Sequence, residues 1–143
     1  MSVSYYLALR GLGTDEDYIE SIGQFLNSRT ETQQSRGKDI YSIGTHVLTM
    51  FFHYDKERTE YINEAYGFKA DVRFSVYPFS AHYEKGIDLL LELVIYMDFL
   101  GVDYLLAEDG EIFRKENGKL TISPKRKNYD SYLNEETIRR FLG

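Results

Sequence analysis

The sequence lacks cysteine entirely, which excludes disulfide bonds and thiolate chemistry. It has no basic and apolar leader typical of a signal peptide. The most apolar stretch, residues 84–100, is too short and too often interrupted by acidic residues to cross a bilayer. We therefore expect a cytoplasmic protein without a membrane partner.

The usual catalytic motifs are also missing. There is no Gly-x-Ser-x-Gly, no Walker loop and no pair of cysteine and histidine. The common sequence motifs for nucleophilic catalysis and for phosphate binding are therefore absent. His46 and His53 lie seven residues apart on an expected strand and would point to opposite faces, while His82 lies in a separate loop. We predict no zinc site, no cofactor and no enzymatic activity. An enzyme whose pocket gathers His46, His82 and carboxylates remains an alternative.

Charge and aromatic content are the informative features of the composition. Twenty-three acidic residues against seventeen basic residues give a net charge of −6, which disfavours nucleic acid and anionic membranes as partners and suits a basic protein. There are thirteen tyrosines and nine phenylalanines. Because tyrosine favours positions that are apolar on one side and wet on the other, we expect some tyrosines to line a binding surface.

The local patterns predict one α+β domain over residues 1–143, since this length suits a single core. Residues 84–100 read as a long apolar helix that must be largely buried. Asp109-Gly110 and Asn117-Gly118 are typical hairpin turns, so residues 102–123 are predicted to form a three-stranded β-meander. The predicted domain is a mainly antiparallel sheet packed by the long helix, with this meander at its C-terminal end.

Further elements are expected from periodicity and capping residues. The run of residues 40–54 passes through residues 47–54, which are apolar on both parities; this predicts a strand near the sheet centre that is covered on both faces. Residues 28–39 are polar throughout and are predicted to be a mobile loop or a ragged strand end. The remaining expectations are strands over residues 3–10 and 71–79, and helices over residues 14–27, 55–67 and 134–143.

One short segment, residues 10–17 (RGLGTDED), resembles the calcium loop that opens an annexin repeat. The resemblance implies that carbonyl oxygens of Gly11 and Gly13 and the carboxylate of Asp55 hold Ca²⁺, which requires hard oxygen ligands. An annexin repeat is wholly helical, whereas residues 47–79 are rich in strand patterns. A strand that stops at a glycine pair and a capped helix start explain the same residues without calcium. A calcium-dependent membrane or ligand-binding module is therefore the alternative function.

A second resemblance covers nearly the full chain. Its segments are residues 5–9 (YYLAL), 63–69 (NEAYGFK), 72–76 (VRFSV), 103–115 (DYLLAEDGEIFRK) and 118–122 (GKLTI). Together with the long helix before residue 103, they resemble the Sit-type immunity family, whose members protect bacteria from lipoprotein toxins passed between kin cells. The resemblance implies a protein that neutralises one cognate toxin by stoichiometric binding.

The predicted contact residues follow from that implied function. Acidic side chains near the first hairpin turn, Glu108, Asp109 and Glu111, could steer association with a cationic toxin. Tyr129 and Tyr132 could supply aromatic anchors. The same acids could equally serve only to keep a turn solvated.

Overall fold

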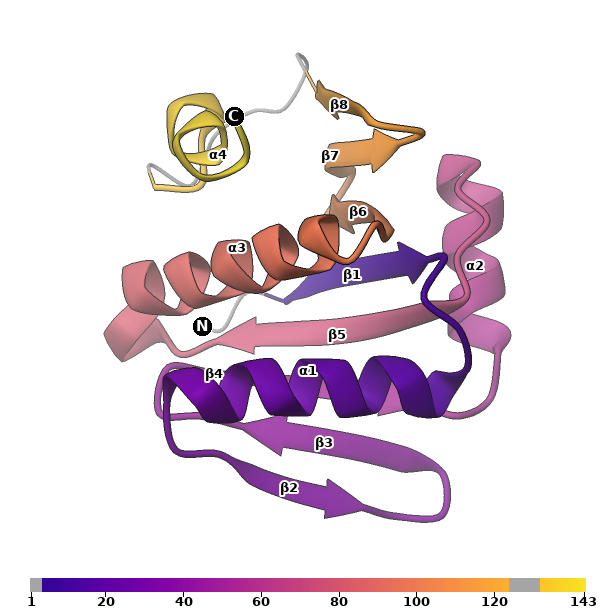
Figure 1. Ribbon diagram of the computed structural model, residues 1–143, viewed down its shortest axis with the longest axis vertical. Coiled ribbons are helices and arrows are strands. Elements are labelled where there is room, and N and C mark those ends of the chain that lie inside the picture. Colours follow the sequence, from indigo (N-terminus) through magenta and orange to yellow (C-terminus); the bar gives the residue numbers. More distant parts are fainter. Residues whose placement is uncertain (1–3, 124–131) are drawn as a thin grey trace.

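The computed structural model describes residues 4–123 and 132–143, which form a single α+β domain (Figure 1). Its eight strands form one sheet in the order β2-β3-β4-β5-β1-β6-β7-β8, and every neighbouring pair is antiparallel. The strands are β1 (Tyr5–Arg10), β2 (Gln33–Arg36), β3 (Ile40–Gly44), β4 (Leu48–His53), β5 (Val72–Pro78), β6 (Asp103–Ala107), β7 (Glu111–Glu116) and β8 (Lys119–Ile122). The helices are α1 (Asp15–Arg29), α2 (Glu57–Tyr66), the 3₁₀ turn η1 (Ser80–His82), α3 (Tyr83–Phe99) and α4 (Glu135–Leu142).

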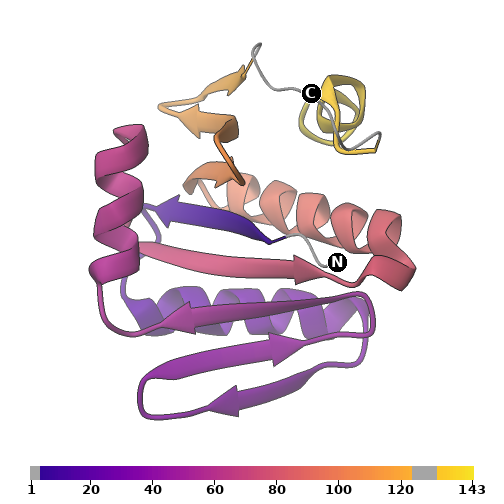
Figure 2. The same ribbon diagram turned by 180° about the vertical axis from the view of Figure 1, so that it is seen from behind.

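The helices are divided unequally between the two faces of the sheet. Figure 1 shows α1 and α3 side by side on one face, with α4 beyond α3. The main core lies under them, where the pairs Leu7–Phe74 and Leu7–Leu106 meet in register across β5, β1 and β6. Figure 2, the view from behind, shows α2 alone on the opposite face, across one end of the central strands. A second, smaller core lies beneath α2, where Ile62 and Phe68 pack against Ala8 and Leu105.

Local sequence signals account for the helix boundaries. Thr14 accepts a hydrogen bond from the Asp17 backbone N–H, and the Asp17 side chain accepts one from the Thr14 backbone N–H, which makes a capping box at the start of α1. The expected helices are confirmed, and α2 ends at Gly67 in the left-handed conformation. Asn134 caps α4 by accepting a hydrogen bond from the Thr137 backbone N–H.

The predicted β-meander is confirmed, but its two turns differ. Asn117 and Gly118 both have positive φ, at 52° and 82°, as a tight two-residue hairpin turn requires. Asp109 and Gly110 do not adopt positive φ. That turn is instead wider, with the Glu108 backbone N–H bonded to the Gly110 carbonyl at 3.0 Å and a register shift at Leu106 and Ala107.

Two expectations for the first half of the chain were wrong. The polar segment 28–39 contains the edge strand β2, in which Ser35 pairs with Ser42; all four residues are exposed, so no apolar alternation marks it. The run 40–54 forms two antiparallel strands, β3 and β4, and it is not covered on both faces. In β4, which lies beside the central strands β5 and β1, the buried positions Leu48, Met50 and Phe52 alternate with half-exposed ones.

Candidate binding face

The sheet surface that faces away from α1 and α3 is uncovered over β3, β4 and the C-terminal part of β5 (Figure 2). We call it the open face. Its side chains come from alternate residues of these strands, with Tyr6 of β1 and Arg73 near the start of β5 at the border where α2 crosses the sheet. They are Tyr6, Ile40, Ser42, Thr49, Phe51, His53, Arg73, Ser75 and Tyr77. Most are half-exposed although several are large and aromatic. Phe51 and Tyr77 contact each other edge to face, with ring centroids 5.5 Å apart.

Arg73 is the unusual member of the open face, because its side chain is a buried charge. Arg73 is only 8 % exposed. Its guanidinium lies 4.0 Å from the centre of the Tyr6 ring, and its Nη2 donates to Ser75 Oγ at 3.0 Å. Its Nε is buried without a hydrogen-bond partner, and no acidic side chain of the described residues pairs with it. Burial accordingly lowers the pKa of Arg73.

α2 brings further polar and aromatic groups beside Arg73. Two hollows meet there, and both are lined by Arg58, Tyr61 and Arg73. The first, of about 380 Å³, is completed by Asp55 and Glu57. The second, of about 400 Å³, is completed by Tyr6, Tyr66, Glu108 and Asp109. Arginines therefore occupy the middle of this region, and carboxylates lie to either side of them.

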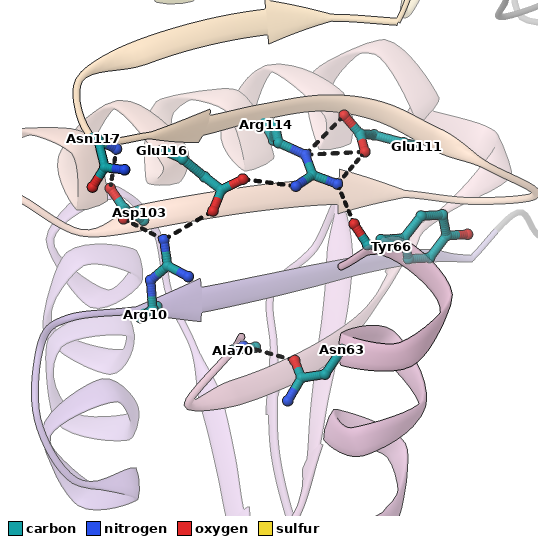
Figure 3. Close-up of polar contacts among 9 residues, drawn as sticks. All are labelled: Arg10, Asn63, Tyr66, Ala70, Asp103, Glu111, Arg114, Glu116 and Asn117. Carbon is teal, nitrogen blue, oxygen red and sulfur yellow. Dashed lines mark hydrogen bonds and ion pairs between the residues drawn. The ribbon is translucent and has the colours of Figure 1, made fainter. Parts of the chain in front are cut away.

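The position of α2 over the sheet is held by an ion-pair network that Figure 3 shows. Glu116 bridges two arginines, with Oε2 at 3.1 Å from Arg10 Nη2 and Oε1 at 2.7 Å from Arg114 Nη1. These hydrogen bonds to arginine lower the pKa of Glu116. Arg114 Nη2 also donates to the backbone carbonyl of Tyr66, the last residue of α2. The meander thus fixes the C-terminal end of α2, and with it the helix that carries Arg58 and Tyr61.

The segment after α2 is secured in the same way. Asn63 Oδ1 accepts a hydrogen bond from the Ala70 backbone N–H at 2.7 Å (Figure 3). The Phe68 ring lies beneath the guanidinium of Arg10 at 4.7 Å and is buried in the smaller core. Because α2 is pinned at these points, Arg58 and Tyr61 are presented to Arg73 from a fixed helix rather than a loop.

His53 lies on the open face, where Arg58, Asp55 and Arg73 are its charged neighbours. Its pKa is lowered from the ordinary value, first by burial and then by the positive charge of Arg58. Asp55 acts in the opposite direction, and Arg73 reinforces the lowering. Both arginines thus disfavour protonation of His53, in addition to the effect of burial.

The four predicted contact residues that the structure describes do not form one surface. Glu108 and Asp109 line the second hollow. Glu111 binds Arg114 through both carboxylate oxygens, each 3.0 Å from Nε, so it holds the network together. Tyr132 donates to Asp88 on α3, on the other face of the molecule, and Tyr129 lies outside the described residues.

The glycine turn compared with a calcium loop is closed by hydrogen bonds. Asp71 Oδ2 accepts from the Gly11 backbone N–H at 2.9 Å and from the Tyr18 hydroxyl at 2.7 Å. Burial and this bond to Asp71 raise the pKa of Tyr18. The carboxylate at this turn is therefore Asp71, while Asp55 accepts from the Glu57 backbone N–H at 3.1 Å at the start of α2. Across residues 4–123 and 132–143, no three histidine or acidic side chains are grouped so as to hold a metal ion.

Among the described residues, the histidines considered for an enzyme belong to no group of three or more histidine or acidic side chains that could hold a metal. His46 is exposed beside a hollow of about 850 Å³ at the far end of β3 and β4, where its Nδ1 lies 3.0 Å from Thr30 Oγ1. The lining of that hollow is mostly uncharged, and its charged member, Glu31, is exposed. His82 is exposed in η1, and His53 lies with Arg73 instead.

The chain was compared with known protein families, with curated proteins and with solved structures. No match is found. No helix of the described residues is long and apolar enough to span a bilayer. Because no relative is found, the candidate site is described from the positions of its own residues.

Sequence reasoning missed Arg73, although a signal was present. In residues 72–77, apolar residues alternate with Arg73, Ser75 and Tyr77, which marks the second face of a strand as polar. An arginine in that phase normally reaches solvent. Arg73 is buried because α2 and the Tyr6 ring lie over it, and neither is adjacent to Arg73 in the sequence.

Proposed function

We propose that this chain is an immunity-type protein that binds one bacterial toxin domain stoichiometrically, and that the open face together with α2 is the binding surface. The observation that carries the proposal is Arg73, a buried charge that lacks a counter-ion among the described residues. An unpaired buried charge is destabilising, so its presence is most simply explained by a partner that supplies the missing group.

The rest of the surface suits a protein partner. Tyr61 is 62 % exposed on α2 and lines the second hollow together with half-exposed Tyr6. Phe51 and Tyr77 are half-exposed on the open face. Tyrosine and arginine are enriched among the residues that dominate interface energetics, because they combine large contact area with polar tips. The resemblance to the Sit-type immunity family supplies the kind of partner.

The acidic residues first assigned to toxin contact take different roles in this proposal. Asp109 stands at the rim of the face, where it can steer a basic partner, while Glu111 is engaged by Arg114. The net charge of −6 favours fast association with a cationic toxin.

The test is co-expression with the toxin domain encoded by the neighbouring gene. The chain should restore growth and form a complex of one copy each, measured by size-exclusion chromatography with light scattering. Absence of both complex and rescue would overturn the proposal.

A matched pair of variants locates the surface. Tyr61→Ala should weaken toxin binding by at least about tenfold if this tyrosine is an anchor. Phe99→Ala is the control, because Phe99 is 83 % exposed at the end of α3, away from the open face. Equal effects of the two substitutions would place the contact surface elsewhere.

A further inference from the structure

Building on the proposed function, we infer that Arg73 and Arg58 receive a single carboxylate side chain of the partner, and that basic residues flank this carboxylate in the partner. The resemblance to immunity proteins leaves the chemistry of this ligand group open. The guanidinium of Arg73, which is unpaired among the described residues, and the order of charges along the two hollows support a carboxylate.

The geometry of Arg73 favours a planar, doubly accepting group. One nitrogen, Nη2, already donates to Ser75, and the face of the guanidinium lies on the Tyr6 ring. The donor that remains buried and unused is Nε. Arginine presents its N–H groups in a planar fork, so a carboxylate that reaches the guanidinium in its plane can accept from Nε together with a second N–H group.

Arg58 supplies the second positive charge. It lies on α2, is exposed, and forms no ion pair within the described residues. It lines both hollows together with Arg73 and Tyr61. A carboxylate at this junction would therefore interact with one buried and one exposed arginine, while the Tyr61 ring limits its access to water.

The surrounding acids select against a more highly charged anion. Asp55 and Glu57 line one hollow, and Glu108 and Asp109 line the other. A phosphate with nearly two negative charges would meet repulsion from both sides. A carboxylate with a single negative charge meets less repulsion from these acids. Lysine or arginine residues on either side of that carboxylate would enter the two hollows and face the acids. The charge order expected in the partner is thus basic, acidic, basic.

A peptide experiment tests the ligand chemistry without the toxin. The probes are acetyl-Lys-Glu-Lys-amide, acetyl-Lys-Gln-Lys-amide and inorganic phosphate, each titrated into the full chain while the Arg73 Nε–H resonance is followed by NMR. The glutamate peptide should shift this resonance and the glutamine peptide should not. An equal response to both peptides, no response to either, or a response to phosphate at lower concentration would overturn the inference.

Substitutions test it in the complex. Arg73→Gln should weaken toxin binding at least about 30-fold, as expected when one member of a buried charge pair is removed. Arg58→Gln should weaken binding less than tenfold, and because Arg58 is exposed this variant remains informative if Arg73→Gln folds poorly. Arg139→Gln is the matched control because it changes the net charge by the same amount. Among the described residues, Arg139 pairs only with Glu135 on α4.

A double-mutant cycle identifies the partner group. In a scan of the toxin from Asp to Asn and from Glu to Gln, one substitution should weaken binding as much as Arg73→Gln does, and the pair should be no worse than either alone. If the wild-type chain binds and rescues but Arg73→Gln binds equally well, the inference fails; toxin binding then stands, and the comparison of Tyr61→Ala with Phe99→Ala alone decides the surface. If the glutamate peptide shifts Arg73 but the toxin does not bind, the proposed function fails and the carboxylate site stands.

Discussion

Replacing Arg73 by methionine should stabilise the isolated protein while it weakens binding. Arg73 is 8 % exposed and has no counter-ion among the described residues. Burial of an ion costs several kcal/mol even after the protein relaxes. The cation–π contact with the Tyr6 ring offsets up to about 2 kcal/mol of this cost, and the hydrogen bond to Ser75 offsets roughly 1.5 to 3 kcal/mol.

The two contacts together offset much of that cost. Because apolar replacements of buried ionic groups are often neutral or stabilising by about 1–4 kcal/mol, we expect the variant to gain on the order of 1 kcal/mol. Methionine keeps an unbranched apolar stem, so packing against Tyr6 is largely preserved. For a chain of 143 residues this gain corresponds to a rise in Tm of roughly 3 °C. A stabilising substitution that removes function is typical of a residue retained for activity rather than for folding.

Urea unfolding followed by circular dichroism measures the effect. The midpoint should move to higher urea with the slope unchanged, since an unchanged slope shows that the same surface is exposed on unfolding. Arg139→Met should change the free energy of unfolding by less than about 0.5 kcal/mol, because Arg139 is exposed. A loss of more than about 1 kcal/mol in the Arg73 variant, with a normal slope, would refute the reasoning. Arg73 would then be a structural charge that the fold needs.

Three further substitutions have clear expected outcomes. Gly86→Ala should lower the free energy of unfolding by more than about 1 kcal/mol, because the new Cβ would lie 2.7 Å from the Val47 carbonyl oxygen. This is the opposite of the usual effect of alanine in a helix, and thermal melts measure it. Tyr18→Phe should destabilise by about 1–3 kcal/mol, since the buried hydroxyl bonded to Asp71 is lost, and an unchanged chemical denaturation midpoint would contradict it. The free energy of unfolding should decrease as pH falls from about 6.5 through the lowered folded-state pKa of His53, because the unfolded chain takes up that proton more readily. In His53→Gln this part of the pH dependence should vanish, which parallel denaturation series at several pH values would reveal.

Local signals in the sequence were sufficient for most of the elements. Capping residues such as Thr14 and Asn134 act within one turn of a helix, and Asn117-Gly118 adopts the positive φ angles that only a few residues tolerate. Because the physics of caps and turns is local, the α+β class, the long helix and the meander could be predicted before any contact between distant segments was known.

Pairing partners and coverage could not be predicted in this way. The β2 strand has no apolar residue, and it forms because the backbone of β3 offers hydrogen bonds at the sheet edge. The two-sided apolar pattern of β4 suggested a doubly covered strand, yet the face that carries Phe51 lacks a helix. Coverage depends on where other elements pack, which the strand's own residues do not record.

The same distinction separates the candidate site from the contact residues named at first. The sequence by itself determined that Arg73 would lie on the polar side of an alternating strand, and that Glu111 and Asp109 would flank a hairpin turn. Only the tertiary structure decided that Arg73 is buried without a counter-ion among the described residues, while Glu111 is neutralised by Arg114. The reason is physical: a charge is paired or unpaired according to its neighbours within a few ångströms in space, and these neighbours come from strands and helices far apart in the chain.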